Sequence, residues 1–354
     1  MAFRRHVGFP QDVFRAVTDR QDKSDDKADD KPRASALLFD AELDGHRVDP
    51  ASLNGDPLRD DQLLWVDLQG DAPLPAVLER AGIDAHLLRE APPDSDGVAT
   101  SQGWTYLHAA ALCAGSGRKT RSEPLVVAVC ESCNMVVTFH PRAVAFLQGL
   151  VDNEAEHLRV GVLHAGSFAA SLLDRMLTDY LDARDAFESA VDRIELQVLR
   201  RPKPAHLSEL QQLRRHASRL RRHLAGQRDM FDALARPDFG SGQPQQVAKH
   251  WQLLSARYAR TMAAVESARE LVNGSFDVYT SRVAEGTNET MRVLTVVTVV
   301  LGTLAVAAGV FGMNFAAELF ESGDRGFWWT VALMTGVGLA SIGAGLGWSF
   351  WRRR

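Results

Sequence analysis

Two long apolar stretches stand near the end of this 354-residue chain. No charged residue occurs from Val293 to Phe311, or from Phe327 to Trp351. A helix of about 20 apolar residues crosses the hydrocarbon core of a bilayer, which is roughly 30 Å thick. The sequence therefore predicts two transmembrane helices, residues 293–311 and 327–351, and requires residues 1–292 to fold outside the lipid.

The charges that flank these stretches predict their orientation. Arg282 and Arg292 precede the first stretch, and residues 352–354, all arginine, form a basic tail after the second. The connecting segment, residues 312–326, is acidic: it carries Glu318, Glu321 and Asp324 against one arginine. Because basic residues stay on the cytoplasmic side, we expect a multi-pass protein of the inner (plasma) membrane with both termini in the cytoplasm and residues 312–326 outside.

The region before the membrane is predicted to begin with an α/β domain. Residues 1–34 include a mixed-charge, low-complexity run and are expected to form a disordered leader. Residues 35–142 alternate short apolar runs with short helical patterns at 75–81 and 84–90. The runs that predict strands are Ala36–Phe39, Leu63–Leu68, Trp104–Leu112, Leu125–Val129 and Met135–Phe139. The net charge of −5 argues against a nucleic-acid partner.

Residues 143–292 are predicted to form a helical stalk. Helical spacing of apolar residues covers 143–152, 167–199 and 205–234, and prolines separate these segments. From Gln245 nothing breaks the pattern before Phe311, so one helix is expected from about residue 245 through the first membrane stretch. The apolar residues of its stalk part form a seam along one side of the helix, and this seam requires partners from the preceding helices or from other copies of the chain. The seam residues are Val247, Trp251, Leu254, Tyr258, Met262, Val265, Val272, Phe276, Tyr279 and Val283.

Three cysteines are too few for a disulfide framework. Cys130 and Cys133 with His140 could bind zinc, but a second cysteine pair is missing, and a simple turn explains the spacing equally well. The sequence contains no phosphate-binding glycine loop and no catalytic constellation. We therefore expect neither an enzyme nor a resident cofactor.

Small and polar residues recur at intervals of three and four along the first membrane stretch. Two interpretations are open: close packing of helices in lipid, or a narrow pore lined by one helix from each subunit. The residues of this stripe are Asn288, Met291, Thr295, Thr298, Gly302, Ala305, Gly309 and Gly312.

The sequence from the start to the end of this stretch is similar to the corresponding segment of a known protein family. The stretch resembles the CorA-like divalent-cation transporters at the spacing that leads into their Gly-Met-Asn signature. The matching residues are Asn288, Met291-Arg292, Leu294-Thr295, Gly309 and the run Gly312–Phe315. The segments 65–68, 172–199 and 210–234 also resemble the family's cytoplasmic parts. A departure from the family is Thr303, which stands where a mid-helix proline is common.

The resemblance implies a funnel-shaped homopentamer that conducts divalent cations, with Mg²⁺ as the first candidate and Co²⁺ and Ni²⁺ as further ones. Gly312, Met313 and Asn314 would form the selectivity filter, and Met291 and Leu294 a gate, unless Leu294 packs between helices. The pore lining would comprise Asn288, Met291, Leu294, Thr295, Thr298, Gly302, Ala305 and Gly309. Glu318, Glu321 and Asp324 would either concentrate cations at the mouth or form a merely solvated loop.

Three further alternatives stay open at this stage. Asp277 on the stalk and Glu90 could bind a regulatory Mg²⁺ or Zn²⁺, or could simply be solvated. A ZntB-like zinc transporter shares the same signature and architecture. A membrane-anchored scaffold or metal sensor without transport would need neither the pore nor the filter.

Overall fold

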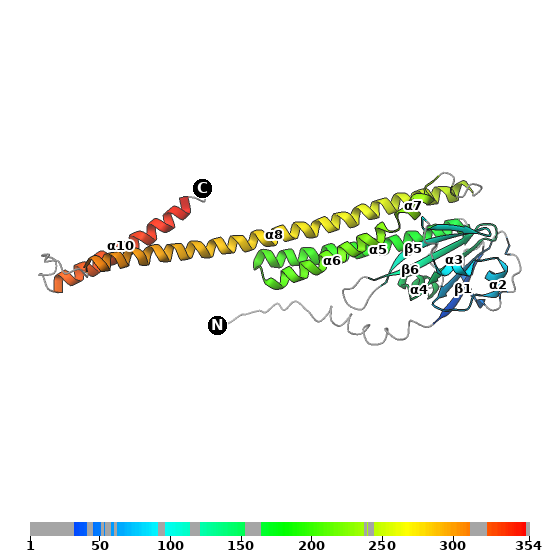
Figure 1. The fold of residues 1–354 in the computed structure, drawn as a ribbon, viewed down its shortest axis with the longest axis horizontal. Coiled ribbons are helices and arrows are strands. Elements are labelled where there is room, and N and C mark those ends of the chain that lie inside the picture. The colour runs from blue at the N-terminus through cyan, green and yellow to red at the C-terminus, as the bar shows by residue number, and fades with distance from the viewer. Residues whose placement is uncertain are drawn as a thin grey trace, which may run out of the picture. The chain divides into compact units, whose positions relative to one another are not determined.

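The computed structural model describes residues 32–40, 45–50, 53, 58–59, 62–90, 96–113, 121–152, 164–236, 239, 244–311 and 324–351. The chain divides into two compact units: residues 1–194 with 205–275, and residues 195–204 with 276–354. Helix α8 (Gln245–Phe311) contributes to both units as one continuous helix of 67 residues (Figure 1). The predicted leader lies mostly outside the described residues, but Arg33 and Ala34 already belong to the first strand.

The first unit is built on a seven-stranded mixed sheet of order β2-β1-β3-β7-β6-β5-β4. Strands β3 and β7 run parallel, and every other neighbouring pair is antiparallel. All seven residues of β3 are buried, because both faces of the sheet are covered. The strands are β1 (Arg33–Phe39), β2 (Gly45–Val48), β3 (Leu63–Gln69), β4 (Val98–Ser101), β5 (Trp104–Cys113), β6 (Arg121–Cys130) and β7 (Met135–His140).

Alternating side chains of the strands enter two separate cores. Val66 and its neighbours on one face pack with Leu78 and Leu88 of the short helices α2 (Ala76–Arg80) and α3 (Ala85–Arg89). Trp65 points to the other face, where its ring lies 5.5 Å from that of Phe168. That face is covered by residues of α4 (Ala145–Asp152), α5 (Ala165–Arg200), α6 (Pro204–Ala225), α7 (Arg228–Leu234) and α8.

The five predicted strands and the two short helices are present. Strands β2 and β4 were missed, because their sequences, GHRV and VATS, carry little apolar alternation. The prediction of one helix over 205–234 was wrong: α6 ends at Ala225 and α7 begins at Arg228. The buried Gln227 between them donates hydrogen bonds from Nε2 to the carbonyl of Ala110 (3.3 Å) and to Tyr180 Oη (3.1 Å), which hold the chain against β5.

Most of the predicted seam residues that belong to the first unit are buried within this chain. Val247, Trp251, Leu254, Tyr258, Val265 and Val272 are at most 5% exposed. Tyr258 stacks on Phe231 of α7 with ring centres 4.3 Å apart, and its hydroxyl donates to the carbonyl of Leu224 (2.9 Å). The preceding helices of the same chain therefore supply the partners that this part of the seam requires.

The zinc interpretation of Cys130, Cys133 and His140 does not hold. Cys130 and Cys133 are joined by a disulfide across the turn between β6 and β7. His140, at the far end of β7, binds Asp67 of β3 through Nε2 at 3.1 Å instead. The turn interpretation of this segment is the one the structure favours.

Candidate functional site

The second unit contains the two predicted membrane stretches as parts of α8 and α10 (Asp324–Trp351). Among the described residues, α8 is the helix that is long and apolar enough to cross a bilayer, and its most apolar window has no buried residue. Large side chains such as Leu301 (61% exposed) and Val306 (69% exposed) are uncovered in the single chain. A surface of this kind is stable only against lipid or against other copies of the chain.

One face of α8 packs against α10. Between residues 293 and 310, the partly covered side chains are Val296, Val300, Thr303, Leu304 and Ala307. Gly338 of α10 is buried on this side, and a methyl group added to it would lie 3.6 Å from Leu304 Cδ2. At that distance an added methyl group would be in ordinary van der Waals contact, so the two helices meet at Gly338 and Leu304 without requiring the glycine.

The predicted stripe lies on the opposite face of α8. An α-helix turns about 100° per residue, so the mean direction of the stripe lies roughly 160° from the mean direction of the partly covered side chains. Its described members are all exposed, as is the predicted gate residue Leu294: Asn288, Met291, Thr295, Thr298, Gly302, Ala305 and Gly309. Contact with α10 thus leaves the small and polar face free to meet something outside the chain.

The glycines of this face are not required by contacts within the chain. No described atom lies within 4 Å of a methyl group placed on Gly302 or on Gly309. Uncovered glycines on a membrane helix are compatible both with the approach of another helix and with a narrow passage.

The threonines of the stripe present oxygen as a hydrogen-bond acceptor. Thr295 Oγ1 donates to the carbonyl of Met291, and Thr298 Oγ1 to that of Leu294, both at 2.8 Å. Because each hydroxyl proton is engaged inside the helix, its oxygen lone pairs face outward. The water molecules around a hydrated cation offer hydrogen-bond donors, which such oxygens can accept.

The charges next to the apolar part of α8 are paired within the helix. Arg282 Nη1 lies 2.7 Å from Glu285 Oε2, and Arg292 Nη1 lies 4.0 Å from Glu289 Oε2. These i,i+3 pairs neutralise the approach to the first membrane stretch without covering the stripe.

Several predicted site residues lie outside the described residues. They are Gly312, Met313, Asn314, Glu318 and Glu321; α8 ends at Phe311, directly before them. Asp324 is the first residue of α10 and is exposed.

The structure does not bring the two predicted regulatory residues into a metal site. Glu90 ends α3 in the first unit, with its carboxylate 3.9 Å from His86 Nε2, and Asp277 is an exposed residue of α8 in the second unit. Among the described residues, no group of three or more His, Cys, Asp or Glu is arranged to hold a metal ion. A regulatory role for Asp277 and Glu90 stays a prediction.

Fold and site together define a membrane protein with an α/β domain, a long continuous helix and an uncovered small-residue face on that helix. The family model for CorA-like Mg²⁺ transporter proteins matches residues 60–343, so the chain belongs to this family. The family consists of membrane transporters and not of enzymes.

Individual relatives agree with this assignment. The chain is 30% identical over 145 residues to the "Cobalt/magnesium transport protein CorA" of Thermotoga maritima, and 28% identical over 176 residues to the "Divalent cation transporter CmaX" of Pseudomonas aeruginosa. These matches cover 41% and 50% of this chain, and 41% and 51% of the relatives, so the chain spans about half the length of the curated relatives it matches.

A solved structure matches over a larger share of the chain. The complete CorA magnesium transporter from Methanocaldococcus jannaschii aligns with a TM-score of 0.64 at 18% identity, over 87% of this chain and 96% of that one. The match supports the order of an α/β domain with a mixed sheet followed by a long helix.

Proposed function

We propose that this chain is the subunit of a homopentameric, passive pathway for divalent cations, with Mg²⁺ as the main cargo and Co²⁺ and Ni²⁺ as further ones. The uncovered small and hydroxyl-bearing face of α8, opposite the face that meets α10, carries the proposal. Five such faces around a central axis would enclose a polar passage while α10 separates each α8 from lipid. The two relatives, which are named for the transport of cobalt, magnesium and divalent cations, support this choice of cargo.

In this proposal Gly312, Met313 and Asn314 form the outer filter. Mg²⁺ requires octahedral oxygen geometry and gives up its water slowly, so a ring of amide and backbone oxygens can select it through its hydration shell. Glu318, Glu321 and Asp324 would raise the local cation concentration at the mouth. Met291 and Leu294 would close the inner end by excluding water. Both termini would then be cytoplasmic.

Two threonines of α8 allow a matched test of the passage. Thr298 and Thr303 each donate to the carbonyl four residues earlier at 2.8 Å, but Thr298 lies on the free stripe and Thr303 on the side that meets α10. Thr298→Val should lower Mg²⁺ flux into proteoliposomes about tenfold, the effect of losing roughly 1.4 kcal/mol of ion stabilisation, because a ring of hydroxyl groups becomes apolar. Thr303→Val should leave the flux unchanged. Equal effects of the two variants would contradict a passage along this face.

A second pair of variants tests the filter. Asn314→Ala should abolish most Mg²⁺ flux, whereas Asn273→Ala, the same change at an exposed position of α8 in the first unit, should not. Unchanged flux in Asn314→Ala would favour a scaffold or sensor without transport. Zn²⁺ flux without Mg²⁺ flux in the wild type would identify a zinc transporter. Light scattering in detergent must give the mass of five subunits, since a monomer cannot enclose the passage.

A further inference from the structure

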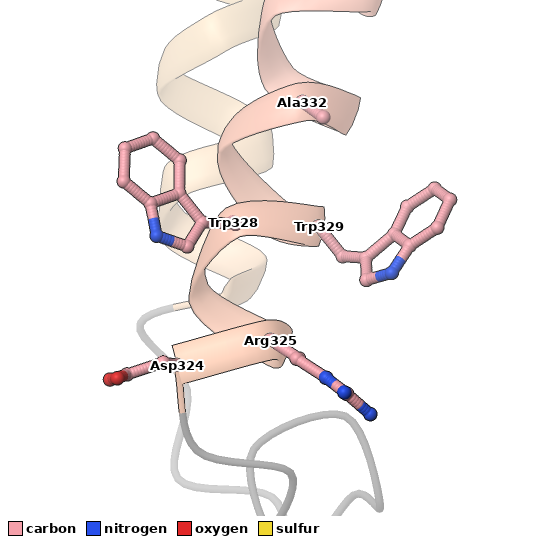
Figure 2. A pocket seen from close by; sticks show the side chains of 5 residues that line it. All are labelled: Asp324, Arg325, Trp328, Trp329 and Ala332. Carbon is pink, nitrogen blue, oxygen red and sulfur yellow. The ribbon is translucent and has the colours of Figure 1, made fainter.

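The first turns of α10 carry a second feature, of which the proposed ion conduction explains only the acidic Asp324. Asp324, Arg325, Trp328, Trp329 and Ala332 line a shallow hollow of about 360 Å³ on the surface of this helix. Figure 2 shows that Arg325 and Trp329 point to one side of α10, with Ala332 above them, while Asp324 and Trp328 point to the other. The hollow is thus flanked by one cation and one anion and by an indole ring on each side.

The position of the hollow places it at the boundary of the bilayer. Asp324 and Arg325 are the last charges before the uncharged stretch that begins at Phe327. Trp328 is 67% exposed and Trp329 73%, so both large rings are uncovered in the single chain. Tryptophan is enriched at the level of the lipid headgroups, where the ring can contact apolar chains and its N–H can contact polar groups.

The chemistry of the lining selects among lipids. The guanidinium of Arg325 can donate two parallel hydrogen bonds to a phosphate, and the neighbouring Trp329 and Ala332 offer apolar surface for the glycerol and upper acyl chain. On the other side, Asp324 attracts an ammonium group, and the face of the Trp328 ring adds a cation–π interaction. An anionic headgroup would satisfy Arg325 but would be repelled by Asp324.

We propose that this hollow binds the headgroup of a zwitterionic phospholipid, with the phosphate at Arg325 and the ammonium group between Asp324 and Trp328. Occupancy would cover the two exposed indole rings and hold the start of α10 at the level of the headgroups. Binding depends on α10 lying in a bilayer and not on conduction along α8, so a lipid measurement and a flux measurement can fail independently.

The test measures bound lipid on the full-length oligomer in detergent by native mass spectrometry, with equal amounts of phosphatidylethanolamine and phosphatidylglycerol added. The wild type should retain phosphatidylethanolamine in preference. Arg325→Gln should lower its retention about fivefold, the effect of losing roughly 1 kcal/mol at an exposed charged site. Arg282→Gln, which removes an arginine from the stalk part of α8, is the matched control and should change nothing.

A second variant should increase the retention of one lipid, a result that loss of folding cannot produce. Asp324→Asn should lower retention of phosphatidylethanolamine and raise retention of phosphatidylglycerol, because the repulsion of anionic headgroups is removed. The proposal is overturned if the wild type prefers phosphatidylglycerol, if Arg325→Gln behaves like Arg282→Gln, or if Asp324→Asn leaves the preference unchanged. It is also overturned if Trp329→Ala dissociates the oligomer without changing lipid retention, since another copy of the chain would then cover the hollow.

Discussion

Replacing Asp67 by asparagine tests a deeply buried ion pair of the first unit. Asp67 Oδ1 accepts a hydrogen bond from Thr138 Oγ1 at 2.5 Å and lies 3.1 Å from Nε2 of the fully buried His140. Nδ1 of the same ring lies 2.7 Å from the carbonyl oxygen of Arg142. Since both ring nitrogens face acceptors, the arrangement is best satisfied by the doubly protonated, charged imidazole.

The pKa of His140 follows from this geometry. Burial alone would lower it, but the hydrogen bond and the charge of Asp67, together with the carbonyl of Arg142, outweigh burial and raise the pKa above its ordinary value. A raised pKa in the folded state means that the pair contributes its full stability below the unfolded pKa of about 6.5. The contribution is lost as the pH rises through the folded pKa.

The size of the effect can be estimated from the groups involved. Breaking a buried ion pair costs about 3–5 kcal/mol when the remaining charge stays unpaired. In Asp67→Asn, His140 can become neutral and accept a hydrogen bond from the new amide, so we expect a smaller cost of about 2 kcal/mol at pH 6. Amide hydrogens of β3 and β7 should then exchange about 30-fold faster in the variant.

Hydrogen exchange of the full-length protein, followed by mass spectrometry at pH 6 and pH 8.5, measures the stability that the Asp67–His140 pair gives to β3 and β7. After correction for the intrinsic pH dependence of exchange, protection of β3 and β7 should fall with rising pH in the wild type but not in Asp67→Asn. Asp71→Asn is the control, because Asp71 follows β3 with its side chain 95% exposed. The reasoning is refuted if wild-type protection rises with pH, or if Asp67→Asn keeps the wild-type pH dependence.

Two further predictions concern the start of α5. The backbone of Asn134 lies in the left-handed region at φ 47°, and its side-chain Oδ1 accepts a hydrogen bond from the amide of Ala165 (2.8 Å). Asn134→Ala should therefore destabilise the start of α5 by about 2 kcal/mol. Faster proteolysis at the start of α5 would show this loss of stability. Asn134→Gly, which relieves the backbone strain but not the lost bond, should recover part of this cost. Gly166→Ala would bring a methyl group into Glu131 Oε1 and to 2.7 Å from Val247 Cγ1, so a loss of about 1–3 kcal/mol in thermal unfolding is expected. Gly149→Ala in α4, with open space around it, should be neutral or slightly stabilising; a loss equal to that of Gly166→Ala would contradict the packing argument.

The sequence by itself determined the elements whose signal is local. Helix α8 has the predicted limits, because 67 consecutive residues contain helical periodicity and no proline. The buried strands β3, β6 and β7 were also predictable: the apolar runs of β6 and β7 are rich in β-branched residues, and β3 is a short run of leucine, tryptophan and valine.

Only the tertiary structure decided the features that depend on contacts between distant segments. The short strands β2 and β4 form because their neighbours in the sheet offer unpaired backbone groups, not because their own residues prefer strands. The break between α6 and α7 depends on the buried Gln227, which hydrogen-bonds to β5 and α5. The periodicity of α8 showed that a small-residue stripe exists, but contact with α10 was needed to show which face stays free, because a helix alone does not specify its partner.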